Sequence, residues 1–241
     1  MNIAQRLDEV RSEYLRRMTS GRGDLLRSVE AYAVQRMGKM LRPRMVLEAA
    51  ATLGDAHAME RWVLLLAVCV EMLHNTSLLH DDVIDHAGER RGTPSVNVRW
   101  NSSVAVLVGD YHLAQIMALL DEVDRPDAAR MVNRTVMDMV EAELLQQEHL
   151  AGRAMSEADY LDVIDGKTAS LFATAAALGN PAFRDFGLCY GRLFQLYDDL
   201  RDGEAPAFAT ALIDSERQRM RQLQGQGLAL AAMPLPSLQM Q

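Results

Sequence analysis

The chain has 241 residues, 49% of them hydrophobic, and this is enough apolar material to bury a large core in one domain. A formal net charge of −8 at pH 7 excludes a general nucleic-acid binder, because such a protein needs a broad basic surface. The two cysteines lie in apolar stretches without a second Cys or His at metal-ligand spacing, so we expect reduced core thiols and a cytoplasmic protein.

Helical patterning dominates the chain. The first residues are charged and lack the apolar segment of a signal peptide, and the longest apolar run, residues 62–70, is far shorter than the roughly 20 residues that span a bilayer. Ala, Leu and Met recur at helical spacing over 64–85, 104–120 and 128–150, and no stretch has the pattern of a strand. We therefore expect an all-α protein of about nine or ten helices without a transmembrane segment.

Two acidic clusters share the DDxxD spacing. In the first, Asp81 and Asp85 are four residues apart, so a helix places both carboxylates on one face, with Asp82 about 100° around it. Mg²⁺ prefers oxygen ligands and commonly binds through one or two carboxylates plus substrate phosphates. For a single cluster, a solvated acidic face is the alternative. The same spacing recurs at Asp198–Asp202 after another apolar helical run, and this repetition favours two metal–diphosphate sites.

Three short basic clusters accompany the aspartates. They are residues 38–43, Arg90–Arg91 and residues 166–168, each next to a predicted helix end. Arginine presents a planar fork to phosphate oxygens, lysine presents a compact charge, and backbone amides near a helix start add further donors. Singly, each cluster is more often a group of surface ion-pair residues. Together with the aspartates, they indicate binding sites for diphosphates.

The order and spacing of the motifs carry a resemblance to a known family. The segments that carry it are 39–43, 74–85, 90–94, Gly109-Asp110, Lys167-Thr168 and 194–202. Over about residues 25–202, the chain resembles the trans-isoprenyl diphosphate synthase (polyprenyl synthetase) family. The resemblance implies an isoprenoid-synthase-type helical bundle around a central cavity. It also implies, usually, a homodimer, and from the length of the chain we expect a single domain over residues 1–241.

The resemblance assigns roles to individual residues. The metal ligands that it implies, for up to three Mg²⁺ ions bound with diphosphate, are Asp81, Asp82, Asp85, Asp198 and Asp202. The allylic diphosphate is expected at Arg90, Lys167, Thr168 and Gln195. Isopentenyl diphosphate is expected at Lys39, Arg42, His74 and Arg91. The residues that would carry catalysis are Asp81, Asp85, Asp198 and Lys167. Taken by itself, His74 is more often an ordinary core histidine.

The implied reaction is the condensation of isopentenyl diphosphate with an allylic diphosphate. Metal ions and cationic side chains offset the charge on the departing diphosphate, so that the allylic C–O bond ionises to a carbocation. The double bond of isopentenyl diphosphate then attacks. Loss of a proton, to the released pyrophosphate itself, gives a chain longer by one five-carbon unit. No nucleophilic side chain is required, and holding the two substrates in line supplies much of the remaining rate.

Product length is expected to depend on the helical turn before the first cluster. Thr76 and Ser77 occupy it, and in the family aromatic side chains at this turn stop growth at short products. Small residues here therefore favour a product of roughly C20 or longer. Leu73 and His112 are further candidates for the floor of the channel. His112 and Gln115 are polar where an apolar floor is expected, which leaves open whether they line the channel or a dimer contact.

The chain departs from the family pattern after Asp202. The family continues with Gly-Lys and a Gly-Lys-Pro-Thr-Leu-Pro-like stretch that supplies another phosphate-binding lysine, and this chain continues differently. We therefore expect residues 203–241 to form an atypical, shortened and peripheral C-terminal part, with a polar helix over 207–224. Arg201 places a cation inside the second cluster. It can pair with a neighbouring carboxylate, or contact diphosphate in place of the missing lysine.

These departures leave two alternatives to an elongating synthase. One is a weakly or non-catalytic subunit of a heterodimeric prenyl synthase, although such a subunit has no physical need for both aspartate clusters and the basic residues. The other is a class I terpene cyclase. Cyclases usually replace the second cluster with an Asn/Asp, Ser/Thr and Glu pattern, which the residues Asp198–Asp202 do not match.

Overall fold

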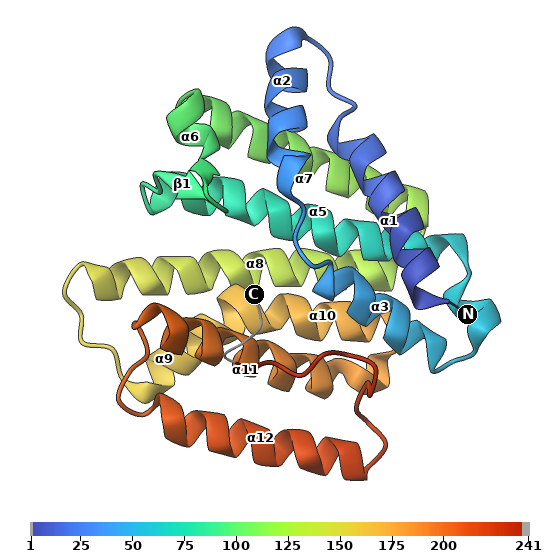
Figure 1. Ribbon diagram of the computed structural model, residues 1–241, viewed down its shortest axis with the longest axis vertical. Helices are drawn as coiled ribbons and strands as arrows, with labels where there is room; N and C mark the ends of the chain where they lie inside the picture. Colours follow the sequence, from blue (N-terminus) through green and yellow to red (C-terminus); the bar gives the residue numbers. More distant parts are fainter. Residues whose placement is uncertain (1, 238–241) are drawn as a thin grey trace. The chain divides into compact units, whose positions relative to one another are not determined.

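The computed structural model describes residues 2–237, except the side chain of Arg36, and the described chain is all-α apart from one very short hairpin (Figure 1). This confirms the predicted fold class. Contacts between Cα atoms divide the chain into two compact units. The first contains the residues up to Arg44 together with Met59–Arg125, and the second contains Met45–Ala58 and the chain from Pro126 onward. The single domain expected over 1–241 stays a prediction.

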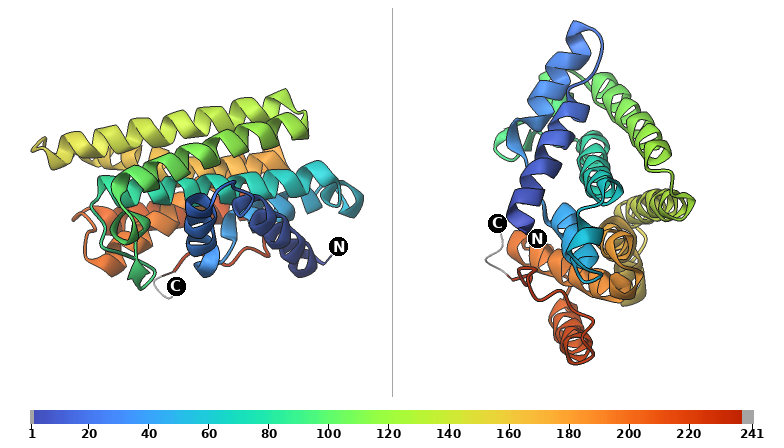
Figure 2. Two further views of the ribbon diagram at one scale, coloured as in Figure 1. Left: turned by 90° about the horizontal axis from the view of Figure 1, so that it is seen from above. Right: turned by 90° about the vertical axis from the view of Figure 1, so that its right-hand side faces the viewer.

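The first unit is built around α5. Its elements are α1 (Ile3–Met18), α2 (Asp24–Ala33), the 3₁₀ turn η1 (Val34–Arg36), α5 (Arg61–Ile84), β1 (Glu89–Arg90), β2 (Thr93–Pro94), α6 (Val96–Arg99) and α7 (Ser102–Val123). Every residue from Val63 to Leu73 is buried, because α5 lies between α1 and α7 (Figures 1 and 2). α7 begins where the side chain of Asn101 accepts a hydrogen bond from the Val104 N–H, which satisfies a donor that the helix start leaves free.

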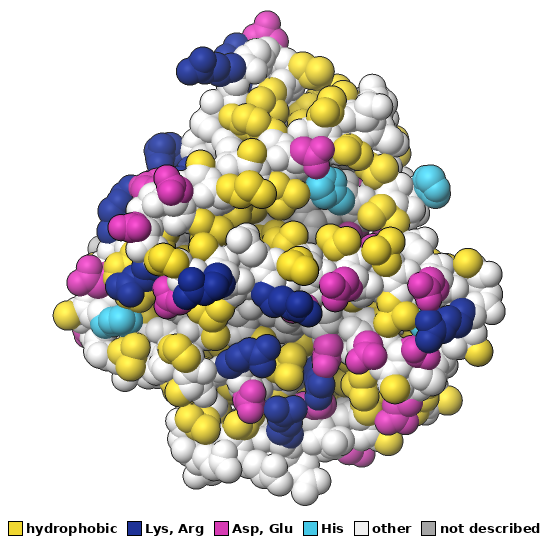
Figure 3. Space-filling view, turned by 180° about the vertical axis from the view of Figure 1, so that it is seen from behind, with side chains coloured by type: hydrophobic (Ala, Val, Ile, Leu, Met, Phe, Trp, Pro, Cys, Tyr) yellow, Lys and Arg dark blue, Asp and Glu magenta, His cyan; other side chains and the backbone are white. Residues whose placement is uncertain are grey.

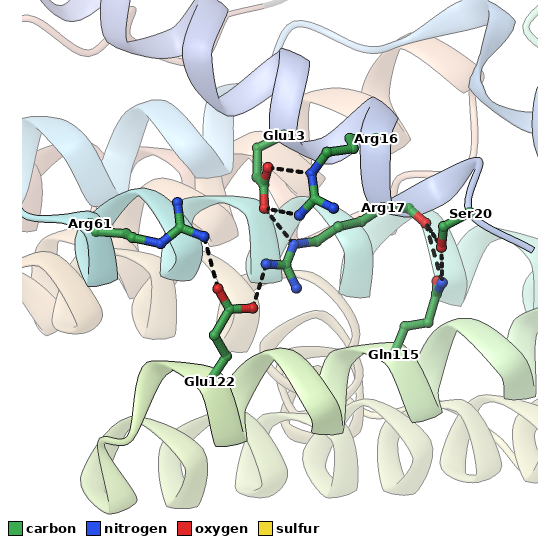
Figure 4. A network of polar contacts seen from close by, with 7 residues as sticks. All are labelled: Glu13, Arg16, Arg17, Ser20, Arg61, Gln115 and Glu122. Atoms are coloured by element: carbon green, nitrogen blue, oxygen red, sulfur yellow. Dashed lines mark hydrogen bonds and ion pairs between the residues drawn. The ribbon is translucent and has the colours of Figure 1, made fainter.

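A polar network ties α1, α5 and α7 together at the surface of the first unit (Figure 4). The Glu122 carboxylate on α7 accepts hydrogen bonds from Arg17 at 2.6 Å and from Arg61 at 2.9 Å. Gln115 Nε2 donates to the Arg17 carbonyl at 3.2 Å and to Ser20 Oγ at 2.8 Å. This polar side chain of α7 is therefore engaged with the end of α1, which accounts for a glutamine where an apolar floor was expected.

The second unit packs its helices around α10 and α11. Its elements are α3 (Leu41–Ala51) from Met45 onward, α4 (Asp55–Ala58), α8 (Pro126–Leu150), α9 (Glu157–Ile164), the π-helical turn η2 (Asp165–Ala169), α10 (Ser170–Gly179), the 3₁₀ turn η3 (Pro181–Phe183), α11 (Arg184–Asp202) and α12 (Ala209–Gly225). α10 and α11 approach closely, and a Cβ atom on Gly187 would lie 2.5 Å from the Phe172 carbonyl oxygen. Phe172 is fully buried against Tyr190 and Phe194, at centroid distances of 5.1 and 5.5 Å.

The described C-terminal residues pack one side against the second unit, and the expectation of an atypical, shortened and peripheral part over 203–241 stays a prediction. α12 buries Ile213, Glu216 and Met220, and it lies along α11 (Figure 1). The segment after it buries Leu230 and Met233. α12 ends at Gly225, well before Pro234, and the buried Leu230 and Met233 lie between the helix end and that proline.

Three predicted helical stretches, 64–85, 104–120 and 128–150, are confirmed as parts of α5, α7 and α8. Among residues 2–237, the expectation that no strand occurs was wrong for the two-residue strands β1 and β2. Among residues 2–237, α5 and α7 are long and apolar enough to cross a membrane by length and composition. A core helix passes the same test, and 72% of the apolar stretch of α5 is buried, against 39% for α7.

Candidate functional site

The first aspartate cluster occupies the last turn of α5. Asp81 is partly buried, Asp82 is buried, and Asp85 is the exposed residue that caps the helix. The carbonyl groups at a helix C-terminus carry partial negative charge, so three carboxylates there repel both one another and the helix end. Cations bound at this helix end would therefore relieve the repulsion.

Arg90 supplies one cation by pairing with Asp82. Its Nε donates to Asp82 Oδ1 at 2.8 Å, and its Nη2 binds the same oxygen. Burial raises the pKa of the Asp82 carboxyl, and Arg90 opposes that rise. Asn97 Nδ2 also donates to the Asp82 carbonyl at 3.0 Å. Asp82 thus turns inward to hold the hairpin that carries Arg90, while Asp81 and Asp85 lie nearer to solvent.

The hairpin after the first cluster separates the two arginines. Glu89 pairs with Pro94 and Arg90 with Thr93, which leaves Arg91 and Gly92 as a two-residue loop. Both loop residues have positive φ, 52° and 73°, as a type I′ turn requires. The turn directs Arg91 toward the segment before α3, where a Cβ atom on Gly38 would lie 2.9 Å from Arg91 Nη2.

Arg42, His74 and Arg91 form a basic group on the inner side of this hairpin. Burial, followed by the charges of Arg42, Arg91 and Arg90, lowers the pKa of His74 well below its ordinary value. His74 is therefore neutral at pH 7, when it can both donate and accept one hydrogen bond. Lys39, which was predicted to act with this group, is exposed.

Glu71 is the counter-charge to this basic group, and sequence reasoning missed it. It is 2% exposed on α5, and Asn75 Nδ2 donates to its carboxylate at 3.2 Å. Burial raises the pKa of Glu71, while Arg42, the Asn75 hydrogen bond and Arg91 oppose the rise. A lone glutamate inside the apolar run of residues 62–73 was the available signal.

A cavity of about 70 Å³ opens beside these residues within the first unit. Its lining includes Asn75, Leu78, Asp82, Arg90 and Arg91. Apolar side chains of α1, α2 and α5, among them Met18 and Leu78, line one part of the cavity, and the hairpin supplies a cationic part, which suits an anion with an apolar tail.

The predicted chain-length residues lie in the interior of the first unit. Leu73 and Thr76 are buried, and the Thr76 hydroxyl has no hydrogen-bond partner among the described residues. Ser77 Oγ donates to the His74 carbonyl at 2.9 Å. His112 is fully buried with its Nε2 3.7 Å from the Glu30 carboxylate of α2, and burial lowers its pKa to about 4. It faces α2 within this unit.

The second aspartate cluster occupies the last turn of α11, in the second unit. Arg201 lies between two of its members, with Nη2 2.5 Å from Asp198 Oδ1 and Nε 3.0 Å from Asp202 Oδ1. Of the two alternatives for Arg201, the structure contains the pairing with neighbouring carboxylates. Asp199 points elsewhere. It accepts hydrogen bonds from Gln195 Nε2 at 2.7 Å and from the Tyr160 hydroxyl.

Lys167 and Thr168 lie in the π-helical turn η2, which interrupts the helix formed by α9 and α10. Such turns inside helices are frequent at functional sites. Lys167 Nζ lies 2.7 Å from Glu143 Oε2 and donates to Gln146 Oε1 at 3.0 Å, so α8 holds it. Thr168 Oγ1 donates to Gln195 Oε1 at 2.7 Å. A chain of hydrogen bonds from Thr168 through Gln195 to Asp199 therefore links the π turn to the second cluster.

The carboxylates fit divalent metal ions that a phosphate helps to bind. Among residues 2–237, no group of three or more His, Cys, Asp or Glu side chains could hold a metal ion by itself. Each cluster instead leaves one or two carboxylates near solvent, and Mg²⁺ is typically bound in this way when substrate phosphates complete its coordination. Neither cluster offers the closed cage of a structural metal site.

Comparison with known proteins identifies one family. Residues 24–210 match the family model described as polyprenyl synthetase. The chain is 36% identical over 202 residues to all-trans-nonaprenyl-diphosphate synthase (geranyl-diphosphate specific) of Rhodobacter capsulatus, covering 79% of this chain and 61% of that protein. It is 32% identical to heptaprenyl diphosphate synthase component 2 of Bacillus subtilis, covering 74% and 53%. The chain thus spans between about half and three fifths of these relatives.

A solved structure has the same fold. The polyprenyl synthase of Caulobacter crescentus, complexed with calcium and isoprenyl diphosphate, superposes with a TM-score of 0.77 at 31% identity and covers 83% of this chain and 62% of that one. The ions and ligand of that complex are consistent with binding of divalent metal in such proteins.

Proposed function

Because the chain belongs to the polyprenyl synthetase family, we propose that it is a trans-prenyltransferase that condenses isopentenyl diphosphate with an allylic diphosphate. The observation that carries this proposal is the repeated placement of a DDxxD cluster on the last turn of a long helix. At both places the helix end adds negative partial charge to the carboxylates, so both attract the metal–diphosphate complexes that such substrates form.

The first cluster would bind the allylic diphosphate through Mg²⁺. Asp81 and Asp85 are the proposed ligands, because Asp82 is committed to Arg90. Bound Mg²⁺ supplies neutralisation of the charge that develops on the departing diphosphate. Arg90 remains within reach of that diphosphate through its second guanidinium edge. Asp82 holds it in place, so little rearrangement is needed as the negative charge grows.

The second cluster and the π turn would bind diphosphate in their own unit. Asp198 is the proposed ligand of a third Mg²⁺, with Asp202 beside it. Lys167 would add a point charge, and the Thr168 hydroxyl, which donates to Gln195 Oε1 here, would turn its single hydrogen to the diphosphate when substrate binds. Glu143 holds the Lys167 ammonium at 2.7 Å, which positions it before substrate arrives.

Isopentenyl diphosphate is proposed to bind at Arg42, Arg91 and His74, with Lys39 at the exposed edge. Neutral His74 donates a hydrogen bond without adding charge, while the two arginines supply the positive charge. Proton loss after attack requires a base, and the released pyrophosphate is the proposed acceptor. The growing chain would extend past Thr76 and Leu73, and the small side chain at position 76 favours products of roughly C20 or longer.

A homodimer is part of the proposal. Val106, Leu107 and Met117 on α7 are 38%, 67% and 65% exposed, and helical spacing places them on one face. Figure 3 shows hydrophobic side chains exposed among interspersed acidic and basic ones. A second copy of the chain is the proposed cover for this apolar face. Changing Leu107→Glu should convert the dimer to a monomer in light scattering, and a dimer that persists would contradict this interface.

One alternative stays open, which is a subunit of a heteromeric synthase. One relative is named as a component, and Arg201 lowers the net negative charge of the second cluster. Such a subunit would be inactive by itself and would require a partner chain for turnover.

The decisive experiment is to incubate the purified chain with Mg²⁺, isopentenyl diphosphate and allylic primers of several lengths, and to identify products by mass. Elongation by the chain alone supports the synthase and excludes the obligate subunit. Asp81→Asn and Asp198→Asn should abolish turnover with helicity unchanged, while Asp8→Asn, an exposed carboxylate on α1, should not. Absence of elongation with every primer would contradict the proposed activity.

A further inference from the structure

Arg192, in the middle of α11, joins two carboxylates from different elements. Its Nε lies 2.6 Å from Asp165 Oδ1 and its Nη2 lies 2.6 Å from Asp165 Oδ2, so the two side chains form a bidentate ion pair. Its Nη1 donates to Glu216 Oε1 on α12 at 2.7 Å. The three side chains are 18%, 30% and 8% exposed. Solvent therefore screens the cluster only partly, and the hydrogen bond to Asp165 is the first cause of the raised pKa of Arg192.

Asp165 begins the π turn that carries Lys167 and Thr168. The Ser170 N–H donates to the Asp165 carbonyl across the five-residue turn. On the other side of the turn, a Cβ atom on Gly166 would lie 2.5 Å from Ala142 Cβ and 2.6 Å from the Asp138 carbonyl of α8. The turn thus contacts α8 through Gly166 and is bound to Arg192 of α11 through Asp165. A displacement of Asp165 would move Lys167, two residues later.

Glu216 brings α12 into this arrangement. Its Oε2 is buried without a hydrogen-bond partner within the described part of the chain, and its carbonyl accepts a bond from Cys189 Sγ at 3.2 Å. A half-buried ion pair adds little stability compared with apolar residues of the same size, because both charges lose hydration. The ion pairs of Arg192 instead fix the positions of the π turn and α12 relative to α11. Nearly all of α12 lies beyond residue 210, where the match to the family model ends.

We propose that Arg192 is a positioning residue for Lys167 and Thr168, the two residues of the π turn that are proposed to bind diphosphate. Through Glu216, the C-terminal helix α12 supports the same binding residues. The proposal rests on the proposed function, because it takes diphosphate as the ligand of the π turn. It assigns a role to the part of the chain in which the expected lysine-containing stretch is replaced. In this chain, the support for the π turn comes from a carboxylate of α12.

The test measures binding of inorganic pyrophosphate with Mg²⁺ by calorimetry, and the KM and kcat for the allylic diphosphate. Arg192→Lys keeps the charge but loses the two-pronged fork, so pyrophosphate affinity should fall and the allylic KM should rise by about ten-fold. Because the chemical groups stay in place, kcat should change much less than KM. Glu216→Gln keeps the shape of the side chain and should give a smaller change in the same direction, about three-fold.

Arg219→Gln is the matched control. Arg219 also joins α12 to α11, through Asp185 at 3.6 Å, but it does not touch the π turn. It should leave pyrophosphate affinity and KM unchanged. Thermal unfolding of all variants verifies that binding is measured on folded protein.

The outcomes separate the two proposals. If the unmodified chain binds no pyrophosphate, the proposed function fails and the positioning role fails with it. If the unmodified chain binds pyrophosphate and folded Arg192→Lys and Glu216→Gln bind it equally well, the proposed function survives and the positioning role is overturned. A loss of affinity in Arg219→Gln as large as in Glu216→Gln would also overturn it, because α12 would then act only through general stability.

Discussion

Arg201→Leu tests whether the second aspartate cluster binds metal. The guanidinium lies 2.5 Å from Asp198 Oδ1 and 3.0 Å from Asp202 Oδ1, so it competes with a divalent ion for the same oxygens. Leucine keeps the helix propensity of the position and removes the charge. The variant should therefore bind Mg²⁺ with pyrophosphate more tightly than the unmodified chain.

The magnitude follows from the geometry. A divalent ion about 5 Å from the guanidinium is repelled by about 1.7 kcal/mol at the dielectric constant of water. Salt at physiological strength screens this repulsion only in part over so short a distance, and about 1 kcal/mol remains, equivalent to about a five-fold gain in Mg²⁺ affinity. The exposed ion pairs that are lost contribute only a few tenths of a kcal/mol to folding.

The assay is the Mg²⁺ concentration that half-saturates pyrophosphate binding. Arg221→Leu, which removes one exposed charge from α12, is the control for the change in net charge and should leave this concentration unchanged. An unchanged Mg²⁺ requirement in Arg201→Leu would refute a metal at Asp198. A raised requirement with weaker pyrophosphate binding would show that Arg201 contacts the diphosphate directly.

Three further predictions concern the first unit. In Gly109→Ala the new methyl group would overlap the ring of His80, the neighbour of Asp81. We expect turnover to fall about ten-fold and stability by about 1–3 kcal/mol, as measured by kinetics and urea unfolding, and full activity would contradict the close packing. The pKa of His112 is lowered to about 4, below its unfolded value. The stability it contributes is therefore present above pH 6.5 and is lost as the pH falls toward 4, by up to about 3 kcal/mol. His112→Gln should flatten the free energy of unfolding over this pH range, and an unchanged slope would assign it to other groups. Thr76→Phe should shorten the product, as read by mass spectrometry, and an unchanged product spectrum would show that the channel does not pass this residue.

The helices and the aspartate clusters could be predicted because their signals are local. Asp81 and Asp85 are four residues apart, so the period of a helix alone places them on one face. The long apolar runs likewise identified α5, α7 and α8. The two-residue strands escaped prediction because so short a hairpin leaves no alternating pattern, although Gly92 marked the turn.

The partners of the site residues could not be predicted because they come from distant parts of the chain. Asp82 looks like its two neighbours in sequence, yet it alone turns inward to Arg90. Tyr160 reaches Asp199 from 39 residues away, and Arg192 reaches Asp165 from 27. No spacing rule relates such residues, because packing of one helix on another brings them together. The π turn at Lys167 is set in the same way, by α8 and α11.

The conformation of Arg91 has a consequence for engineering. Its φ of 52° lies in the left-handed region, which is roughly 1–2 kcal/mol unfavourable for a residue with a Cβ atom and is readily adopted by glycine or asparagine. A search for thermostable variants would therefore select Gly or Asn at position 91 as improvements to the hairpin. Those variants would lose the guanidinium that lies over Gly38, so selection for heat resistance and selection for substrate binding pull this position in opposite directions.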